Sequence, residues 1–227
     1  PMVDANPVLQ GLLAKPRSHE GVNNQRMKSY PGGFLMFAWA GSTKTMRGRS
    51  APWIVADEID GYGGTVEGDE VQLLWQRAAT FGDQRLLVEI STPTIKGESR
   101  IEAAYDQGDQ RHFHVACPHC DEHQTLSWGQ VSWDRDDDGE HKPETAGYAC
   151  KHCGALWNDG ERIAAIRTAE KVGAGWKASK PFRGHASYHL NELYSCFRRL
   201  RDIVQSFLDK KAAGDLQSFI NVSLAET

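Results

Sequence analysis

The chain has 227 residues, of which 40% are hydrophobic and 25% are charged, and this length is enough for one large domain or one and a half. The formal net charge of -4 excludes a protein that binds nucleic acid through its overall charge, so any DNA contact has to come from local basic patches. No apolar run reaches the roughly 18 residues of a membrane span, and no signal peptide is present, so we expect no membrane association.

The first forty residues contain one strong structural signal. Residues 8–14 predict a short helix, and residues 15–30 read as a polar loop. The apolar run 34–40 follows a Pro-Gly-Gly turn and predicts a buried strand. Residues 41–45, Gly-Ser-Thr-Lys-Thr, have a partial likeness to a phosphate-binding loop. They lack its second glycine at the required spacing, and only about seven residues separate them from the next strand, so we interpret the likeness as chance.

The most informative stretch is residues 52–60, in which an apolar run leads directly into Asp57 and Glu58. The run predicts a strand buried on both faces, as in a parallel sheet covered by helices. The carboxylates then lie at the carboxyl end of the strand, where open α/β sheets bind ligands. In P-loop hydrolases an Asp at this point holds Mg²⁺, and a following Glu can deprotonate the attacking water. The alternative is an ordinary strand end in solvent.

A second strand follows after a predicted helix. Apolar residues at helical spacing over 69–81 precede the strand 85–90, which makes one βαβ unit with a right-handed crossover. This strand ends at Ser91-Thr92-Pro93-Thr94. If the two strands are neighbours, these hydroxyls lie near Asp57. A short helix over 101–105 and an extended segment over 113–116 come next.

Four of the five cysteines form two C-x-x-C pairs separated by 29 residues, namely Cys117, Cys120, Cys150 and Cys153. Each pair directs two sulfurs at one ion, and two pairs complete the tetrahedral Cys₄ shell that zinc prefers. Residues 113–157 therefore predict a small zinc ribbon with an insertion between its pairs. The alternative is four reduced cysteines without a metal. We expect His119 and His152 to be neighbours of the site and Cys196 to be a buried or half-buried small residue.

The rest of the chain reads as mainly helical. Asn158 or Asp159 can cap a helix that continues to about residue 169. The patterns beyond it predict a strand and two helices, over residues 185–190, 197–211 and 216–224. The dense basic cluster of the chain consists of Arg198, Arg199 and Arg201. It is either a solvated helix face or a contact to phosphates.

Taken together, these motifs resemble the large subunit of tailed-phage terminases, specifically the lambda-like GpA branch. The resemblance covers about residue 30 to the end. Its most specific pieces are Ser-Thr-Pro-Thr-Ile-Lys-Gly over 91–97 and Cys-Pro-His-Cys over 117–120, followed by residues 187–191 and 219–227. The family carries an ATPase that drives DNA into the capsid and a nuclease that cuts it.

The resemblance implies an α/β fold with a P-loop NTPase-like parallel sheet that carries the inserted zinc ribbon. Residues 1–112 would be part of the ATPase core, 113–157 the ribbon, and 158–227 a helical return segment that leads to an absent nuclease domain. Asp57 would bind Mg²⁺ with ATP, and Glu58 would activate water. Ser91 and Thr92 would sense phosphate and couple hydrolysis to movement. Arg47 precedes the strand like a basic residue of other terminases, although Arg47 and Arg49 would equally suit a solvent-facing loop.

The implied partners are double-stranded DNA, the terminase small subunit, the capsid portal and further copies of the chain, in the cytoplasm of an infected or lysogenic bacterial host. The phosphate loop, an adenine-binding motif and the nuclease are missing, so we expect an interior piece of a longer protein. Asp60 is expected at a surface loop position, although it could support the site. The alternatives are a helicase-like ATPase, and a zinc-ribbon nucleic-acid-binding or assembly module without catalysis.

Overall fold

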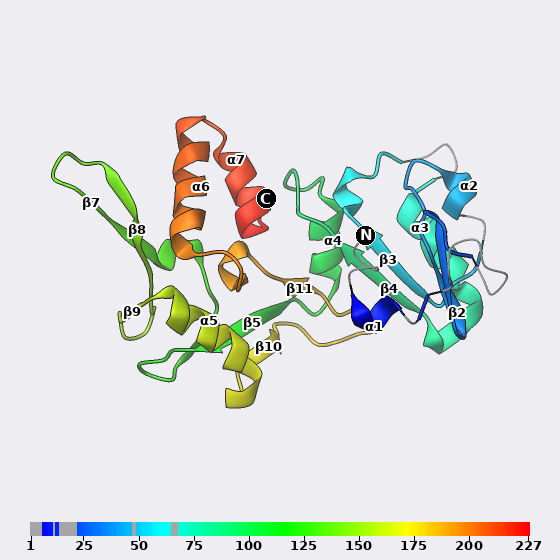
Figure 1. Ribbon diagram of the computed structural model, residues 1–227, viewed down its shortest axis with the longest axis horizontal. Helices are drawn as coiled ribbons and strands as arrows, with labels where there is room; N and C mark the ends of the chain where they lie inside the picture. The colour runs from blue at the N-terminus through cyan, green and yellow to red at the C-terminus, as the bar shows by residue number, and fades with distance from the viewer. Residues whose placement is uncertain (1–5, 11, 14–21, 47–48, 65–67) are drawn as a thin grey trace. The chain divides into compact units, whose positions relative to one another are not determined.

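A computed structural model describes residues 6–10, 12–13, 22–46, 49–64 and 68–227 (Figure 1). The chain divides into two compact units. The first consists of residues 1–56 and 61–88, and the second of residues 57–60 and 89–227. The division falls near the carboxyl ends of two paired strands. The few residues that come directly after each of these strands belong to the second unit.

The first unit begins with α1 (Pro7–Gln10) and a hairpin of β1 (Met27–Tyr30) and β2 (Gly33–Met36). The strands are antiparallel, and the turn places Gly32 at φ 84°, a left-handed conformation that favours glycine. The expected polar loop over 15–30 is therefore wrong for β1. The expected buried strand over 34–40 ends at Met36, and the expectation of burial is wrong for Phe37 and Trp39, which follow the strand and are exposed.

The predicted βαβ unit is present as β3 (Trp53–Asp57), α3 (Glu70–Ala78) and β4 (Leu86–Ile90), with a short α2 (Thr43–Met46) before it. Asp69 caps α3 by accepting a hydrogen bond from the backbone N–H of Gln72. β3 pairs with β4, and the N–H of Leu86 donates to the carbonyl of Pro52 at 2.7 Å. This bond joins the beginnings of the two strands, and their ends also lie beside each other. The two strands therefore run parallel.

β3 is buried on one face, not on both as its sequence suggested. Side chains alternate along a strand. Ala56 is 1% exposed, whereas Trp53 and Val55 on the other face are 75% and 66% exposed. These exposures show that no described residue covers most of that second face. The apolar run therefore predicted the strand correctly, but it overstated how much of the strand is buried.

The second unit is built on β5 (Arg111–Ala116), which follows α4 (Arg100–Gln107). β10 (Gly175–Ala178) pairs antiparallel with β5, and β11 (Tyr188–His189) lies parallel on its other side. β6 (His123–Gln124) extends the end of β5. A separate antiparallel sheet consists of β7 (Val131–Arg135), β8 (His141–Ala149) and β9 (Leu156–Trp157).

Helices follow the second sheet. α5 (Asp159–Thr168) starts with a complete capping box between Asn158 and Glu161, so of the two predicted caps Asn158 is the one used. α6 (Leu200–Ala212) and α7 (Leu216–Phe219) come next, and a π-helical turn over Ile220–Leu224 extends α7. Short 3₁₀ turns cover Ile59–Gly61, Ala79–Gln84, Trp128–Gln130, Ala169–Val172 and Glu192–Tyr194.

One hydrophobic core joins the cysteine-bearing strands to the C-terminal helices. Trp128 of the ribbon segment packs on Phe207 of α6 and Phe219 of α7, with ring centroids 5.1 and 4.8 Å apart. Tyr148 and Trp157 are fully buried in the same cluster. Residues 113–157 and 158–227 thus share a core, and the division of the chain into three domains stays a prediction. None of the described helices is long and apolar enough to cross a membrane.

Candidate hydrolysis site and cysteine cluster

The two acidic residues predicted at the end of β3 are there and are accessible. Asp57 is the last residue of β3, and both Asp57 and Glu58 are exposed. Glu58 has φ 56°, in the left-handed region that residues other than glycine rarely adopt. The turn after it is anchored by Ile59, which is 1% exposed. Strained backbone of this kind is common at functional sites, so the observation favours a role for Glu58 beyond that of a loop residue.

Asp60 connects this turn to the segment after β4. Its Oδ2 accepts from the backbone N–H of Thr94 at 3.0 Å and from Thr94 Oγ1 at 2.9 Å. Its Oδ1 accepts from the N–H of Ile101, in the first turn of α4, at 2.8 Å. The N–H of Asp60 donates to Ser91 Oγ at 3.2 Å. Asp60 is half-buried in a 3₁₀ turn and bonded to two other segments, so the favoured expectation of a surface loop position is wrong.

The hydrogen bonds around Asp60 also set its charge state. Partial burial raises the pKa of the carboxyl, but hydrogen bonds from Ile101, Ser99 and Thr94 outweigh this effect and lower the pKa below its ordinary value of 3.8. A carboxylate next to the amino-terminal turn of a helix is also favoured by the helix dipole. Asp60 is consequently ionised at neutral pH.

The remaining predicted residues of this site are Ser91, Thr92 and Arg47. Ser91 and Thr92 follow β4 and are half-buried, and Ser91 Oγ donates to the carbonyl of Thr92 at 3.0 Å. Ser91 is thus brought to the end of β3 through its bond with Asp60. Arg47 lies outside the described residues. Arg49 lies over the ring of Phe34, with 5.2 Å from its guanidinium carbon to the centroid.

The four predicted cysteines form one cluster, in which all four sulfurs lie within 4.8 Å of one another. The Sγ atoms of Cys117 and Cys153 are 3.8 Å apart, and those of Cys120 and Cys150 are 3.9 Å apart. A disulfide would need about 2.05 Å. Four sulfurs at about 2.3 Å from one zinc ion in tetrahedral geometry lie about 3.8 Å from each other. The sulfur positions therefore fit a tetrahedral Cys₄ metal centre.

Hydrogen-bond donors favour the thiolate form at Cys150, whereas burial raises the pKa of Cys117 and burial together with the neighbouring thiols raises that of Cys120. Gln124, which is fully buried, donates from Nε2 to Cys150 Sγ at 3.2 Å and accepts from the N–H of Lys151 through Oε1. The N–H of His152 also donates to Cys150 Sγ, at 3.3 Å. Burial raises the pKa of Cys150, but these donors and the N–H of Cys153 lower it to about 6. Sequence reasoning missed the role of Gln124, because a single Gln between two cysteine pairs belongs to no recognisable motif.

The histidines of the pairs do not join the group of potential metal ligands found among the described residues. His119 Nε2 lies 3.2 Å from Glu161 Oε1 on α5, which attaches the first cysteine pair to that helix. The prediction that the two histidines are neighbours of the site agrees with this geometry. Cys196 is half-buried and apart from the cluster.

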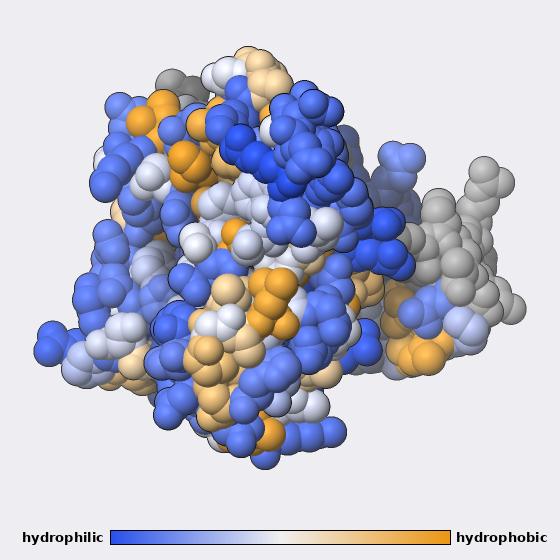
Figure 2. Space-filling view, turned by 90° about the vertical axis from the view of Figure 1, so that its left-hand side faces the viewer, coloured by the Kyte–Doolittle hydropathy of each residue, from blue (hydrophilic) through white to orange (hydrophobic). Residues whose placement is uncertain are grey.

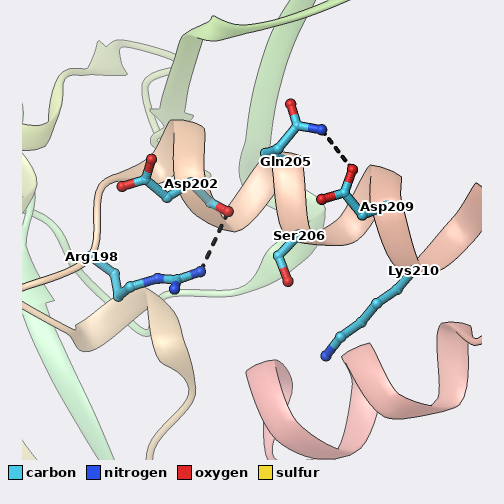
Figure 3. Close-up of a pocket in the computed structure, with 6 residues that line it drawn as sticks. All are labelled: Arg198, Asp202, Gln205, Ser206, Asp209 and Lys210. Atoms are coloured by element: carbon cyan, nitrogen blue, oxygen red, sulfur yellow. Dashed lines mark hydrogen bonds between the residues drawn. The ribbon is translucent and has the colours of Figure 1, made fainter.

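Two hollows occur in the second unit. One, of about 580 Å³, runs along the polar side of α6, and Figure 3 shows its lining residues Arg198, Asp202, Gln205, Ser206, Asp209 and Lys210. Arg198 is paired there with Glu192 at 3.0 Å, so the basic cluster is partly neutralised. The side of the molecule in Figure 2 is mostly hydrophilic, with small separate hydrophobic areas. The other hollow, of about 350 Å³, lies beside Ser91 and Pro93.

Comparison with known proteins gives two family matches. Residues 1–176 match the family model described as "Phage terminase large subunit gpA, ATPase domain". Residues 185–227 match the one described as "Terminase large subunit gpA, endonuclease domain". The second match differs from the expectation that residues 158–227 belong wholly to the ATPase domain and that the nuclease domain is absent.

Two relatives are similar over most of the chain. The "Terminase, large subunit" of Enterobacteria phage P21 is 28% identical over 233 residues, and that of Escherichia phage lambda is 26% identical over 236 residues. Each alignment covers 90% of this chain and 35% of the relative, so the chain spans about a third of their length. No solved structure matches.

Proposed function

Because the chain belongs to the phage terminase large subunit gpA family, we propose that it is part of an ATP-hydrolysing motor that moves viral double-stranded DNA into a capsid. The proposal rests on one observation above all. Parallel strands β3 and β4 end together, with Asp57 and Glu58 on one strand end and Ser91 on the other. A P-loop NTPase sheet has this arrangement at its ligand-binding edge.

Each residue of this edge has a proposed part in hydrolysis. Asp57 would hold Mg²⁺, which neutralises phosphate charge when ATP is bound. Glu58 is exposed and would orient a water molecule and accept its proton. Ser91 and Thr92 would face the γ-phosphate side of the site and pass a change there to the segment that follows β4. Arg47 would assist by contacting phosphate.

The cysteine cluster has a proposed structural part. Cys117, Cys120, Cys150 and Cys153 would hold one zinc ion, and the four sulfurs would leave no open position for chemistry. The ion would supply folding free energy to a segment in which the strands after the two cysteine pairs, β6 and β9, are short. The ribbon is therefore proposed as a scaffold for the C-terminal helices, on which it packs.

The wider assignments follow from the family alone. We propose double-stranded DNA, the terminase small subunit, the capsid portal and further copies of the motor subunit as partners. The proposed location is the cytoplasm of an infected or lysogenic bacterial host.

The test uses the full-length parent protein with Glu58→Gln. The variant keeps the metal ligand Asp57 and loses the base, so MgATP binding should persist while kcat falls by about 10²–10⁴-fold. Glu144→Gln, an exposed position on β8, is the matched control and should retain the parent's kcat. Turnover of Glu58→Gln equal to that of the control would reject Glu58 as the base and, with it, this reading of the site.

A further inference from the structure

We propose that Asp60 is a positioning residue for this site, which holds the segment after β4 in a set place relative to Glu58. The inference rests on the proposed function and adds a residue that neither acts on water nor binds metal. Asp60 accepts three hydrogen bonds from two separate segments, at Thr94 and at Ile101. Its own N–H bonds Ser91. Both strand ends are therefore attached to one residue.

The position of Asp60 in the chain makes this attachment relevant to Glu58. Only Ile59 separates the two residues, and Ile59 is buried. The turn is thus held by a buried side chain and by the Asp60 carboxylate, while Glu58 remains exposed at φ 56°. Loss of the Asp60 bonds would free the turn and the Ser91–Thr94 segment to move independently. Displacement of a catalytic group by about 1 Å can cost on the order of 10²-fold in rate.

Helix capping alone does not explain the arrangement. Ser99 already caps α4, because its Oγ accepts from the N–H of Glu102 at 3.1 Å. The two bonds from Thr94 lie outside the helix and have no capping role. The carboxylate therefore connects its own turn to two other segments, the one after β4 and the start of α4. A helix cap would bond only to the start of α4.

The chemistry of the carboxylate defines a sharp substitution. Both oxygens are used as acceptors, Oδ1 by Ile101 and Oδ2 by Thr94. In Asp60→Asn one oxygen becomes an NH₂ group, which is a donor. That variant has nearly the same shape, but either Ile101 or Thr94 then faces a donor and loses its acceptor.

The first measurement is made on the present chain and needs no hydrolysis. Amide hydrogen exchange of Thr94 and Ile101 should be protected in the wild type, and at least one of these two amides should lose protection in Asp60→Asn. Asp83→Asn, an exposed carboxylate before β4, should leave both amides unchanged. Full protection of both amides in Asp60→Asn would overturn the proposal.

The second measurement is kinetic and uses the full-length parent. Asp60→Asn should lower kcat by about 10-fold to 100-fold with the KM for ATP unchanged. Thr94→Val, which loses the hydroxyl bond, should show a smaller fall in kcat, and Thr94→Ser, which keeps the hydroxyl, should restore it. A role in stability alone would lower the melting temperature without this split between kcat and KM.

The outcomes separate the two proposals. If Glu58→Gln impairs turnover and Asp60→Asn does not, Asp60 is not a positioning residue and the proposed function stands. If Glu58→Gln turns over normally, the proposed function fails whatever the exchange of Thr94 and Ile101 shows.

Discussion

Arg162 and Asp159 form an ion pair across one turn of α5, with 2.8 Å between Nη2 and Oδ1, and together they hold the start of α6. The guanidinium is fully buried and donates to the backbone carbonyls of Leu193, Ser195 and Arg198. The Asp159 carboxylate accepts from the N–H of Leu200, the first residue of α6. The segment from the 3₁₀ turn at Glu192–Tyr194 to the start of α6 is therefore held by one charged pair.

The first prediction concerns this pair. Arg162→Ala removes the donors of three carbonyls and leaves Asp159 without its partner, and the loss of one member of a buried pair typically costs about 3–5 kcal/mol. Arg167→Ala on the exposed side of α5 should change the free energy of unfolding by less than about 0.5 kcal/mol. Urea denaturation followed by circular dichroism measures both. Equal midpoints for the two variants would contradict the role given to Arg162.

The second prediction concerns the aromatic core between the ribbon and the C-terminal helices. Phe219 is 1% exposed and contacts the rings of Trp128 and Phe207, so Phe219→Ala should cost about 3–5 kcal/mol through lost packing and a cavity. Phe197 is 97% exposed, and Phe197→Ala should have almost no effect on stability. Thermal unfolding of the two variants gives the comparison, and a similar loss in both would mean that α7 does not pack as described.

The third prediction concerns the metal. The purified reduced chain should contain one zinc ion, and Cys150→Ser should abolish its binding, whereas Cys196→Ser should leave the zinc content unchanged. Elemental analysis decides this part. A content near zero in wild-type chain that has not met a chelator would reject the site.

The structure also extends the expected effect of that substitution. A ribbon that folds by itself around the metal would unfold locally over about 113–157 in Cys150→Ser and leave the strand at 53–56 intact. Because the ribbon shares its core with α6, hydrogen exchange should show lost protection in α6 as well, and none in β3. Unchanged protection of α6 in the variant would show that the shared core forms without the metal.

The fourth prediction follows from the lowered pKa of Asp60. A carboxyl whose pKa is lower in the folded state stabilises the protein above its unfolded-state pKa, and this stabilisation disappears as pH falls through the folded-state value. The unfolded-state pKa is near the ordinary 3.8. Wild type should therefore melt at a higher temperature than Asp60→Asn at neutral pH, and the difference should shrink below about pH 4. A difference that does not depend on pH would show that charge at Asp60 is not the cause.

Local patterns predicted the parts of this structure that depend on neighbouring residues. The C-x-x-C pairs brought all four cysteines into one predicted group, and Asn158 was one of two residues predicted to cap α5, whose hydrogen-bond partner Glu161 is three residues away. The strand at 53–57 was identified from its apolar run. In each case the interacting groups, or the pattern that reports them, lie close together in the chain.

The features that sequence reasoning missed depend on distant partners. Asp60 finds its partners 31, 34 and 41 residues further on, and no local pattern reports them. The burial of β3 was overestimated because an apolar sequence indicates that a strand tends to be buried, but it does not show whether other residues cover each face. The hairpin of β1 was missed because Met27–Tyr30 is short and polar, and its pairing with β2 supplies the order.

The segment that matches the endonuclease model pairs and forms hydrogen bonds with the segment that matches the ATPase model. β11 adds to the sheet of β5, Asn221 Nδ2 donates to the carbonyl of Thr94 at 2.7 Å, and Thr227 Oγ1 donates to Glu102 at 2.7 Å. A chimaeric terminase joined between residues 176 and 185 would therefore combine one part of this folded core with a segment from another protein. Such a protein would keep the pairing of β11 with β5 and the bonds of Asn221 and Thr227 only if the foreign segment supplied equivalent residues, so the boundary between the two matched segments lies inside one folded core.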